Sequence, residues 1–396
     1  MIRLGRIVRL YKGLGLLLLN TVIVLFGLNL VALAIVKLAE PLMPSSPVED
    51  KYGELLRKAY PALGEEQMSA LLTETWSRPV MYEAYTQFKE RPYAGQFINV
   101  SAFGNRLIED QAPLPLDPRY YNVFVFGGST TFGYGVADTE TLPSYLQKEL
   151  MQRVSGKIRV YNFGRGYYFS TQERILFQQL LASGLKPQAA IFVDGLNEFV
   201  LGDGLPAFTS GLAAFMNGSY VPPTQQWYAD LPIFQLIELV RGQAPTLTAA
   251  GGMTEPANLS PTAEAAIYDK RPYLENVIDR YLVNKHMIQS IAGLYGVRTI
   301  FVWQPIPTYK YDLNQHIFAG SGFGTHSYSK YGYPLMKERL DKNLLGYNFV
   351  WSADIQEDAK KLLYVDLVHY SPELNRMLAA HIAQLVSERR LIYLPQ

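Results

Sequence analysis

The sequence predicts a three-layer α/β domain with a parallel sheet of about five strands. Short apolar runs that end in glycine or a polar turn alternate with longer stretches of helical spacing. The expected strands are YNVFVFGG at 121–128, IRVYNFG at 158–164, AAIFVDG at 189–195 and VRTIFVWQP at 297–305; the expected helices lie at 63–76, 142–154, 171–183, 273–295 and 372–388. Strands that are apolar throughout are typical of parallel sheets, and strand–helix alternation places helices on both faces of such a sheet.

The N-terminus predicts one membrane-spanning helix in addition. An uncharged run of 24 residues, 13–36, follows four Arg and Lys residues and ends at Lys37. At ~1.5 Å per residue it can cross a ~30 Å hydrocarbon core, and it exceeds the ~7–15 residues of a cleaved signal peptide's apolar region. Positive charge ahead of the run predicts a cytoplasmic N-terminus. We therefore expect a single pass through the inner (plasma) membrane, with the remaining chain periplasmic or otherwise extracytoplasmic.

The chain divides into four predicted parts. Residues 1–12 are a basic cytoplasmic tail, 13–37 a signal anchor, 38–115 a stalk and N-terminal extension, and 116–396 a catalytic domain. The proline-rich stretch up to residue 60 has the composition of the stalk.

The catalytic domain carries an insertion at about 203–270, which is rich in Gly, Pro, Ala and Thr and poor in charge. A loop of this length seldom lacks a function. A lid over the substrate groove, a membrane-facing surface and a partner surface remain open for it, and we expect it to cover part of the groove.

Composition excludes several classes of protein. The net charge is +1 and there is no basic run in the body of the chain, which argues against nucleic-acid binding. The chain has no cysteine, so disulfides, thiol chemistry and Cys/His zinc motifs are excluded. We expect no metal and no organic cofactor.

Ser129 is the candidate nucleophile. It follows Gly127 and Gly128 at the end of the first expected strand. Ligands bind at the carboxyl ends of parallel strands, and the N–H groups of such a turn lie near a positive helix end. Taken alone, the motif could equally be a phosphate-binding turn or a helix N-cap. It lacks the lysine of a P-loop, the glycine spacing of a dinucleotide-binding loop, and the Gly-x-Ser-x-Gly of an α/β-hydrolase elbow.

His369 is the candidate base. Among five histidines it alone has a carboxylate placed to orient it, because Asp366 precedes it by three residues. Such a carboxylate fixes the tautomer of the ring and stabilises the imidazolium. The other histidines fall in expected helices or in a Gly- and Tyr-rich segment that could line a groove: His286, His381, His316 and His326.

Two further strand ends offer hydrogen-bond donors for an oxyanion, each worth ~2.7–4 kcal/mol. Asn197 follows the third expected strand and could present a side-chain amide. The turn after the second strand, which contains Gly166 and Tyr167, could present a backbone N–H. Either stretch alone is compatible with an ordinary turn.

Together, these four stretches in this order resemble the conserved blocks of the SGNH (GDSL-like) hydrolase superfamily. Those blocks are a Gly-Asp-Ser or Gly-Gly-Ser turn, a glycine turn, a Gly-x-Asn-Asp turn and a late Asp-x-x-His. The form Gly-Gly-Ser-Thr-Thr-Phe-Gly resembles a bacterial, often membrane-attached branch, and the similarity covers roughly residues 120–390. A flavodoxin-like parallel sheet is the implied fold.

The resemblance implies a role for each candidate. Ser129 would be the nucleophile, His369 the base and Asp366 its orienting carboxylate, with Asn197 and a backbone N–H near Gly166 completing the oxyanion hole beside the Ser129 amide. Two positions depart from the family pattern: Glu198 stands where Asp is usual, and Tyr167 stands where an ungapped alignment expects the last glycine of Asn-x-Gly-x-x-Gly.

The expected function is that of a serine esterase acting on acyl esters, with O-acetyl groups of extracytoplasmic cell-envelope glycans as substrate. The main alternative is an O-acyltransferase with the same residues, working with a membrane acyl-donor partner such as a multi-pass acyltransferase or with a polysaccharide-export system. The second alternative is a catalytically degenerate scaffold.

Overall fold

The computed structural model describes residues 2–39, 46–111, 114–153, 157–218, 231–240 and 267–392. The chain forms two compact units. One comprises residues 46–215 and 251–396 and holds the parallel sheet, while the other comprises 1–45 and 216–250.

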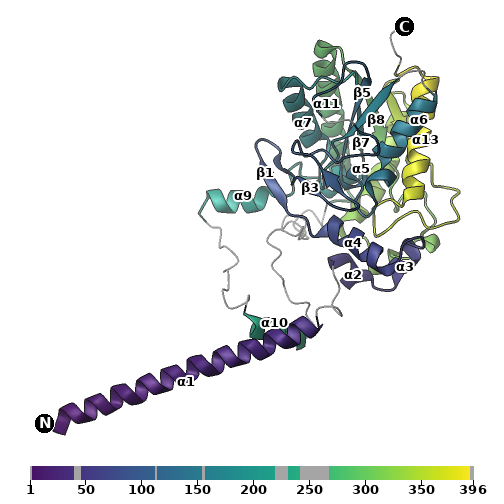
Figure 1. Ribbon diagram of the computed structural model, residues 1–396. Coiled ribbons are helices and arrows are strands. Elements are labelled where there is room, and N and C mark those ends of the chain that lie inside the picture. Colours follow the sequence, from purple (N-terminus) through teal and green to yellow (C-terminus); the bar gives the residue numbers. More distant parts are fainter. Residues whose placement is uncertain are drawn as a thin grey trace. The chain divides into compact units, whose positions relative to one another are not determined.

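The larger unit is built on a five-stranded parallel sheet, as the sequence predicts (Figure 1). Its strands are β5 (Tyr121–Gly127), β6 (Ile158–Asn162), β7 (Ala189–Asp194), β8 (Arg298–Trp303) and β9 (Phe349–Trp351). Their order is β6-β5-β7-β8-β9, and every neighbouring pair is parallel. This is the 2-1-3-4-5 order of doubly wound sheets, in which the crevice for ligands lies between the first and third strands. The active site is therefore expected where β5 and β7 end.

Helices cover both faces of the sheet, which gives three layers. On one face Val123 and Val125 of β5 pack with α6 (Leu142–Arg153) and α13 (Pro372–Glu388). On the other face Phe124 and Phe126 pack with α7 (Ser170–Ala182), α11 (Arg271–Tyr295) and α12 (Ser329–Asp341). The side chains of a strand alternate between its two faces, so the uniformly apolar sequence of β5 follows from burial on both sides.

The N-terminal extension is folded onto this domain. It contains α2 (Pro47–Tyr52), α3 (Leu55–Ala59), α4 (Glu65–Trp76) and two short hairpins, β1 (Val80–Glu83) with β2 (Gln87–Glu90) and β3 (Tyr93–Ala94) with β4 (Asn99–Val100). Leu56 is fully buried in a cluster that includes Val365, and Tyr60 donates a hydrogen bond to the carbonyl of Gly135 (2.8 Å). The stalk expected up to residue 60 is therefore shorter, because Pro47 begins a helix at a position that proline favours.

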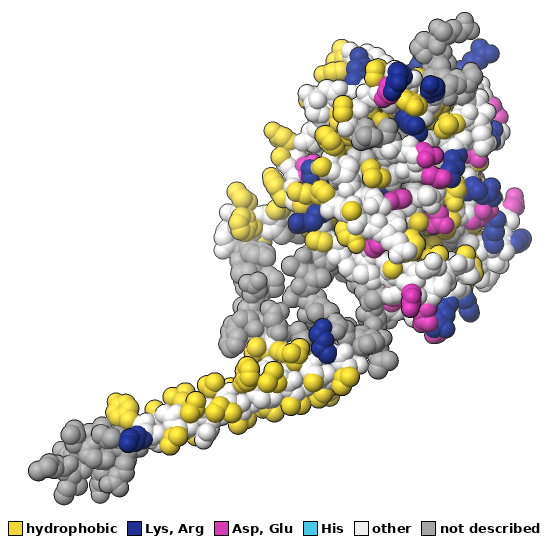
Figure 2. Space-filling view, in the orientation of Figure 1, with side chains coloured by type: hydrophobic (Ala, Val, Ile, Leu, Met, Phe, Trp, Pro, Cys, Tyr) yellow, Lys and Arg dark blue, Asp and Glu magenta, His cyan; other side chains and the backbone are white. Residues whose placement is uncertain are grey.

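The remaining helices are α5 (Ser129–Phe132), α8 (Leu196–Val200), α9 (Thr209–Met216), α10 (Pro232–Val240) and α1 (Ile2–Ala39); short 3-10 turns lie at Asp138–Glu140, Leu313–Gln315, Ala319–Ser321 and Gly324–Tyr328. By length and composition, α1 can cross a membrane between Tyr11 and Leu38. Figure 2 shows hydrophobic side chains along most of its length. Helix α10 belongs to the same unit and packs against α1.

Candidate active site

Ser129 is the first residue of α5 and directly follows β5. The turn before it requires glycine, because a Cβ atom on Gly128 would lie 2.5 Å from Nδ2 of Asn197 and 3.2 Å from the carbonyl oxygen of Tyr168. Glycine at this position thus allows the amide of Asn197 to approach the turn that carries Ser129. The two residues come from the ends of β5 and β7, which flank the crevice predicted from the strand order.

The structure brings Ser129, His369 and Asp366 into one chain of hydrogen bonds. Nε2 of His369 lies 2.9 Å from Oγ of Ser129, and Nδ1 lies 2.7 Å from Oδ2 of Asp366. A carboxylate only accepts hydrogen bonds, so Nδ1 carries the ring proton and Nε2 accepts from the hydroxyl. This is the geometry of a nucleophile activated by an oriented base.

Asp366 is ionised at neutral pH. Burial acts to raise its pKa, but the charge of His369 and hydrogen bonds from the ring and from the N–H groups of His369 and Val368 outweigh burial and lower the pKa to about 2. The two backbone bonds measure 2.8 and 2.9 Å and fix the second carboxylate oxygen. A negative charge is therefore held beside Nδ1, where it stabilises the imidazolium formed when His369 takes a proton.

Two aromatic rings hold the imidazole in place. Trp76 of α4 meets the ring of His369 edge-on with centroids 5.3 Å apart, and Tyr134 stacks on it at 5.4 Å. Trp76 belongs to the N-terminal extension, so this extension takes part in building the site. Nothing in the spacing of Trp76 relative to the motifs predicts this contact.

Asn197 lies on α8 just after β7 and lines the same cavity as Ser129. Its Nδ2 donates to the carbonyl of Tyr168 (2.8 Å), which orients the amide. An amide nitrogen carries two hydrogens, so a second remains for a substrate oxygen. Asn197 therefore lies in the same cavity as Ser129, and its role as an oxyanion donor stays a prediction.

Gly166 also lines the cavity, but its N–H donates to Oε1 of the buried Glu90 (3.3 Å). Tyr134 donates to the same oxygen (2.9 Å), and Arg78 pairs with the other carboxylate oxygen (3.2 Å). An amide directed at a buried carboxylate is not directed at a substrate oxyanion. This hydrogen bond therefore disfavours the amide of Gly166 as the oxyanion donor.

Tyr167 has a φ of +57°, in the left-handed region that favours glycine. The glycine that the family pattern places here therefore has a conformational reason. In this chain a phenol replaces it, and Tyr167 lines the cavity beside Ser129 and Asn197. That this side chain crowds the acyl site stays a prediction.

The cavity at Ser129 has a volume of about 200 Å³. Its other walls come from α2 (Val48, Lys51 and Tyr52), from Trp76, and from the segment around His369. His326 lines it as well, and burial together with the charge of His369 lowers the pKa of His326 to about 4, so that this ring is neutral at pH 7. No residue of 203–270 that the structure describes lines the cavity, so the expectation of a lid finds no support in the described part of the insertion.

Glu198, the second departure from the family pattern, has a structural role. Its Oε1 accepts the N–H of Ser170 (2.7 Å), the first residue of α7, whose N-terminal amides need partners. Glu198 is buried near Asp194 and Glu173, and burial, followed by the charges of these neighbours, raises the pKa of both Asp194 and Glu173 well above the usual range.

These buried carboxyls predict a pH-dependent stability. The folded-state pKa of Glu173 exceeds its unfolded value of ~4.3. The contribution of Glu173 to the free energy of unfolding is therefore fully present below pH ~4.3, and it is lost as the pH rises through the folded-state pKa. Each unit by which folding raises a pKa lowers the free energy of unfolding by ~1.4 kcal/mol once the group is ionised. We expect Glu173→Gln to raise the free energy of unfolding at pH 7 and to change it little at pH 4. Chemical denaturation at both pH values measures this, and Glu66→Gln on the exposed surface of α4 should change neither. Equal effects of Glu173→Gln at the two pH values would contradict the prediction.

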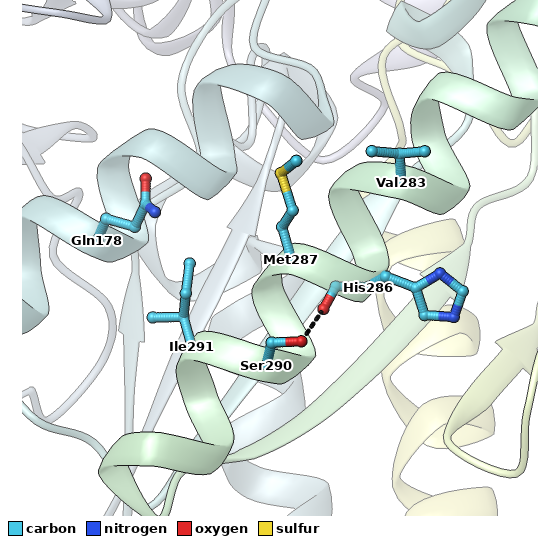
Figure 3. A pocket seen from close by; sticks show the side chains of 6 residues that line it. All are labelled: Gln178, Val283, His286, Met287, Ser290 and Ile291. Atoms are coloured by element: carbon cyan, nitrogen blue, oxygen red, sulfur yellow. Dashed lines mark hydrogen bonds between the residues drawn. The ribbon is translucent and has the colours of Figure 1, made fainter.

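Within the described ranges, no hydrogen bond joins the ring of another histidine to a serine or threonine hydroxyl. His316 and His381 each have a ring nitrogen 3.1 Å from a backbone carbonyl, of Leu367 and Trp351 respectively. His286 lines a second cavity, of about 360 Å³, between α7 and α11 (Figure 3). There its ring points away from Gln178, and Ser290 donates to the carbonyl of His286 (2.9 Å), so this serine and histidine do not form an activated pair.

Within the residues that the structure describes, no group of three or more His, Cys, Asp and Glu side chains is placed to hold a metal ion.

No protein-family model matches the chain, and no curated protein matches it significantly. Solved structures do match. A protein from Desulfitobacterium hafniense described as a lipolytic protein of the G-D-S-L family is 13% identical, with 67% of this chain and 99% of that chain covered and a TM-score of 0.34. The esterase EstA from Pseudoalteromonas sp. is 11% identical, with coverages of 68% and 97% and a TM-score of 0.35. The acetylxylan esterase Axe2 from Geobacillus stearothermophilus is 16% identical, with coverages of 67% and 94% and a TM-score of 0.34.

All three TM-scores lie below 0.5, and we infer function from the geometry of the site instead.

Proposed function

We propose that this protein is a membrane-anchored serine esterase of the SGNH type with Ser129 as its nucleophile. The observation that carries the proposal is the hydrogen-bond chain from Asp366 through His369 to Ser129, with heavy-atom distances of 2.7 and 2.9 Å. Its position at the carboxyl end of β5, beside the amide of Asn197, supports acyl transfer.

The reaction follows from this arrangement. Oγ of Ser129 attacks the ester carbonyl while Nε2 of His369 takes the hydroxyl proton. The carbonyl oxygen becomes an oxyanion, to which Nδ2 of Asn197 and the backbone N–H of Ser129 donate. When the tetrahedral intermediate collapses, the leaving alcohol receives the proton from His369. Water, deprotonated by the same ring, then attacks the acyl-Ser129 ester and regenerates the serine.

The cavity favours a short acyl group. Its volume of about 200 Å³ is below the ~300–1,000 Å³ of pockets for drug-sized ligands, and Tyr167, Tyr52 and Trp76 line it. Together with the predicted extracytoplasmic location of the domain, this supports O-acetyl groups of cell-envelope glycans as the substrate.

We expect Tyr167→Gly to shift selectivity toward longer acyl groups. Removing the phenol opens the cavity, and each methylene buried there is worth ~0.8 kcal/mol, or about fourfold in kcat/KM. The ratio of kcat/KM for a butyrate ester to that for the matching acetate, which is two methylenes shorter, should rise by about fifteenfold. Tyr85→Gly is the matched control: Tyr85 also has a left-handed φ, +68°, but it is exposed and outside the cavity, so the ratio should not change. A ratio unmoved by Tyr167→Gly would show that this side chain does not limit the acyl group.

Hydrolysis and transfer to a glycan proceed through the same acyl-Ser129 intermediate, so they differ only in which hydroxyl attacks it. A lid that excludes water favours a bound acceptor. The partition of the acyl-enzyme between water and a bound hydroxyl therefore distinguishes the esterase from the acyltransferase.

The test is a partition experiment on the full chain in detergent. A chromogenic acetyl ester is supplied with and without envelope-glycan fragments, and acetate and acetyl-glycan are both measured. We expect steady acetate release that glycan does not divert. A burst followed by glycan-dependent turnover would favour the acyltransferase, and no acyl-enzyme at all would favour the degenerate scaffold.

A further inference from the structure

Helix α10 (Pro232–Val240) is unusually apolar. Seven of its nine residues are apolar, and only Gln235 and Glu238 are polar. It belongs to the same compact unit as α1 and packs against it (Figure 1). A helix that is apolar over most of its circumference is stable where it is buried or meets lipid, not where it faces water.

A polar side chain of α1 provides a partner for the N-terminal end of α10. The N–H of Ile233 donates to Oδ1 of Asn29 (3.3 Å), while Nδ2 of Asn29 donates to the carbonyl of Leu25 within α1 (2.8 Å). The first amides of a helix have no acceptor inside the helix, and in hydrocarbon there is no water to replace one. Asn29 thus satisfies a backbone donor that would be costly to leave unpaired in lipid.

The position of Asn29 sets the depth of this contact. It precedes Lys37, the end of the apolar run, by eight residues, or ~12 Å along the helix axis. The hydrocarbon core is ~30 Å thick, so in a spanning α1 Asn29 lies in the half of the bilayer nearest Lys37. The N-terminal end of α10, bonded to Asn29, shares that half.

The faces of the two helices agree with this placement. Ala32 of α1 is buried, and Ile233 and Leu236 of α10 are half-buried. Ile237 and Val240 of α10 remain 39% and 80% exposed. These four side chains of α10 follow the i, i+3, i+4, i+7 spacing of one helix face, and α1 leaves Ile237 and Val240 of that face partly uncovered, so that they can meet a further apolar surface.

We propose that α10 is embedded beside α1 in the membrane leaflet nearest Lys37, with Ile237 and Val240 in contact with lipid acyl chains. The inference rests on α1 spanning the membrane, and it makes α10, one part of the insertion, a membrane-facing surface. The chain then meets the bilayer twice, at 13–37 and at 232–240, so the enzyme is held to the membrane by more than its anchor.

The absence of cysteine from the chain allows a direct test. Ile237→Cys and Val240→Cys are labelled with an environment-sensitive fluorophore in the full chain, reconstituted in phosphatidylcholine vesicles. We expect blue-shifted emission that is quenched by lipids carrying a nitroxide near the headgroup end of the acyl chain and is insensitive to aqueous iodide. Leu294→Cys and Tyr347→Cys, at sites 85% and 76% exposed on the catalytic domain, should show the reverse.

A label at Val24→Cys on α1 distinguishes a failure of the α10 proposal from a failure of the membrane anchor. If its label is quenched by lipid while those at Ile237 and Val240 respond only to iodide, the anchor stands and the proposal for α10 is overturned. Shielding of the α10 labels from both quenchers would also overturn it, because the helix then packs on protein. In Asn29→Leu we expect weaker lipid quenching at Ile237, with Asn20→Leu as the control in α1. Unchanged quenching in Asn29→Leu would refute the role of this hydrogen bond.

Discussion

Replacement of Ser129 by alanine is expected to lower ester turnover by about 10⁶-fold, the loss seen when the nucleophile of a serine hydrolase is removed. Ser129 is the only serine whose hydroxyl lies within hydrogen-bond distance of a carboxylate-paired imidazole among the described residues, at 2.9 Å from Nε2 of His369. A fluorophosphonate probe reacts only with such an activated serine. Labelling of the full chain should therefore disappear in Ser129→Ala. Loss of one half-buried hydrogen bond should cost no more than ~1 kcal/mol of stability.

Ser290→Ala is the matched control for this prediction. Ser290 also lies near a histidine, His286, in a cavity, but its hydroxyl donates to the backbone carbonyl of that residue and not to its ring (Figure 3). Turnover and labelling should stay at the wild-type level. Labelling that persists in Ser129→Ala, or that is lost in Ser290→Ala, would overturn the assignment of the nucleophile.

The sequence predicted those parts of the site that depend on local spacing. Asp366 and His369 are three residues apart, so their contact needs only one turn of chain. Ser129 and Asn197 follow strands that neighbour each other, and the strand-end rule places their side chains at the same edge of the sheet. The four principal strands were predicted for a related reason, since runs buried on both faces are apolar throughout.

Contacts supplied by the N-terminal extension were not predicted. Trp76 packs on the ring of His369, and Glu90 accepts a hydrogen bond from the N–H of Gly166. Both contacts join segments that are far apart in the sequence. Arg106 makes similar long-range contacts: it binds Asp138 (2.8 Å), and it donates to the carbonyl of Phe132 (3.0 Å), the last residue of α5. No periodicity marks such a residue, because its role depends on where the extension packs. Strand β9, with three residues, is too short to show a pattern.

Replacement of His369 by alanine is expected to lower ester turnover by about 10⁶-fold, and Asp366→Asn by about 10⁴-fold. The difference follows from their roles: His369 accepts the proton of Ser129, whereas Asp366 orients the ring and stabilises its charge. His369→Ala also leaves the buried Asp366 without its ring donor, so lost stability must be separated from lost catalysis. His369→Gln can still donate an amide hydrogen bond to Asp366 but cannot act as a base, and it should be as inactive as His369→Ala while unfolding closer to the wild type.

His381→Ala is the control that tests whether the loss of any half-buried histidine lowers ester turnover. Its Nε2 lies 3.1 Å from the carbonyl oxygen of Trp351, and burial, opposed by that hydrogen bond, lowers its pKa. Removing His381 should cost stability but leave kcat/KM near the wild-type value, because His381 touches no reacting atom.

Added imidazole should restore part of the turnover of His369→Ala, since imidazole can occupy the vacated space beside Ser129 and take the proton. Imidazole should not affect the turnover of His381→Ala. If His381 proved essential and His369 dispensable, the hydrogen-bond chain through Asp366 would be structural, and the base would have to lie elsewhere.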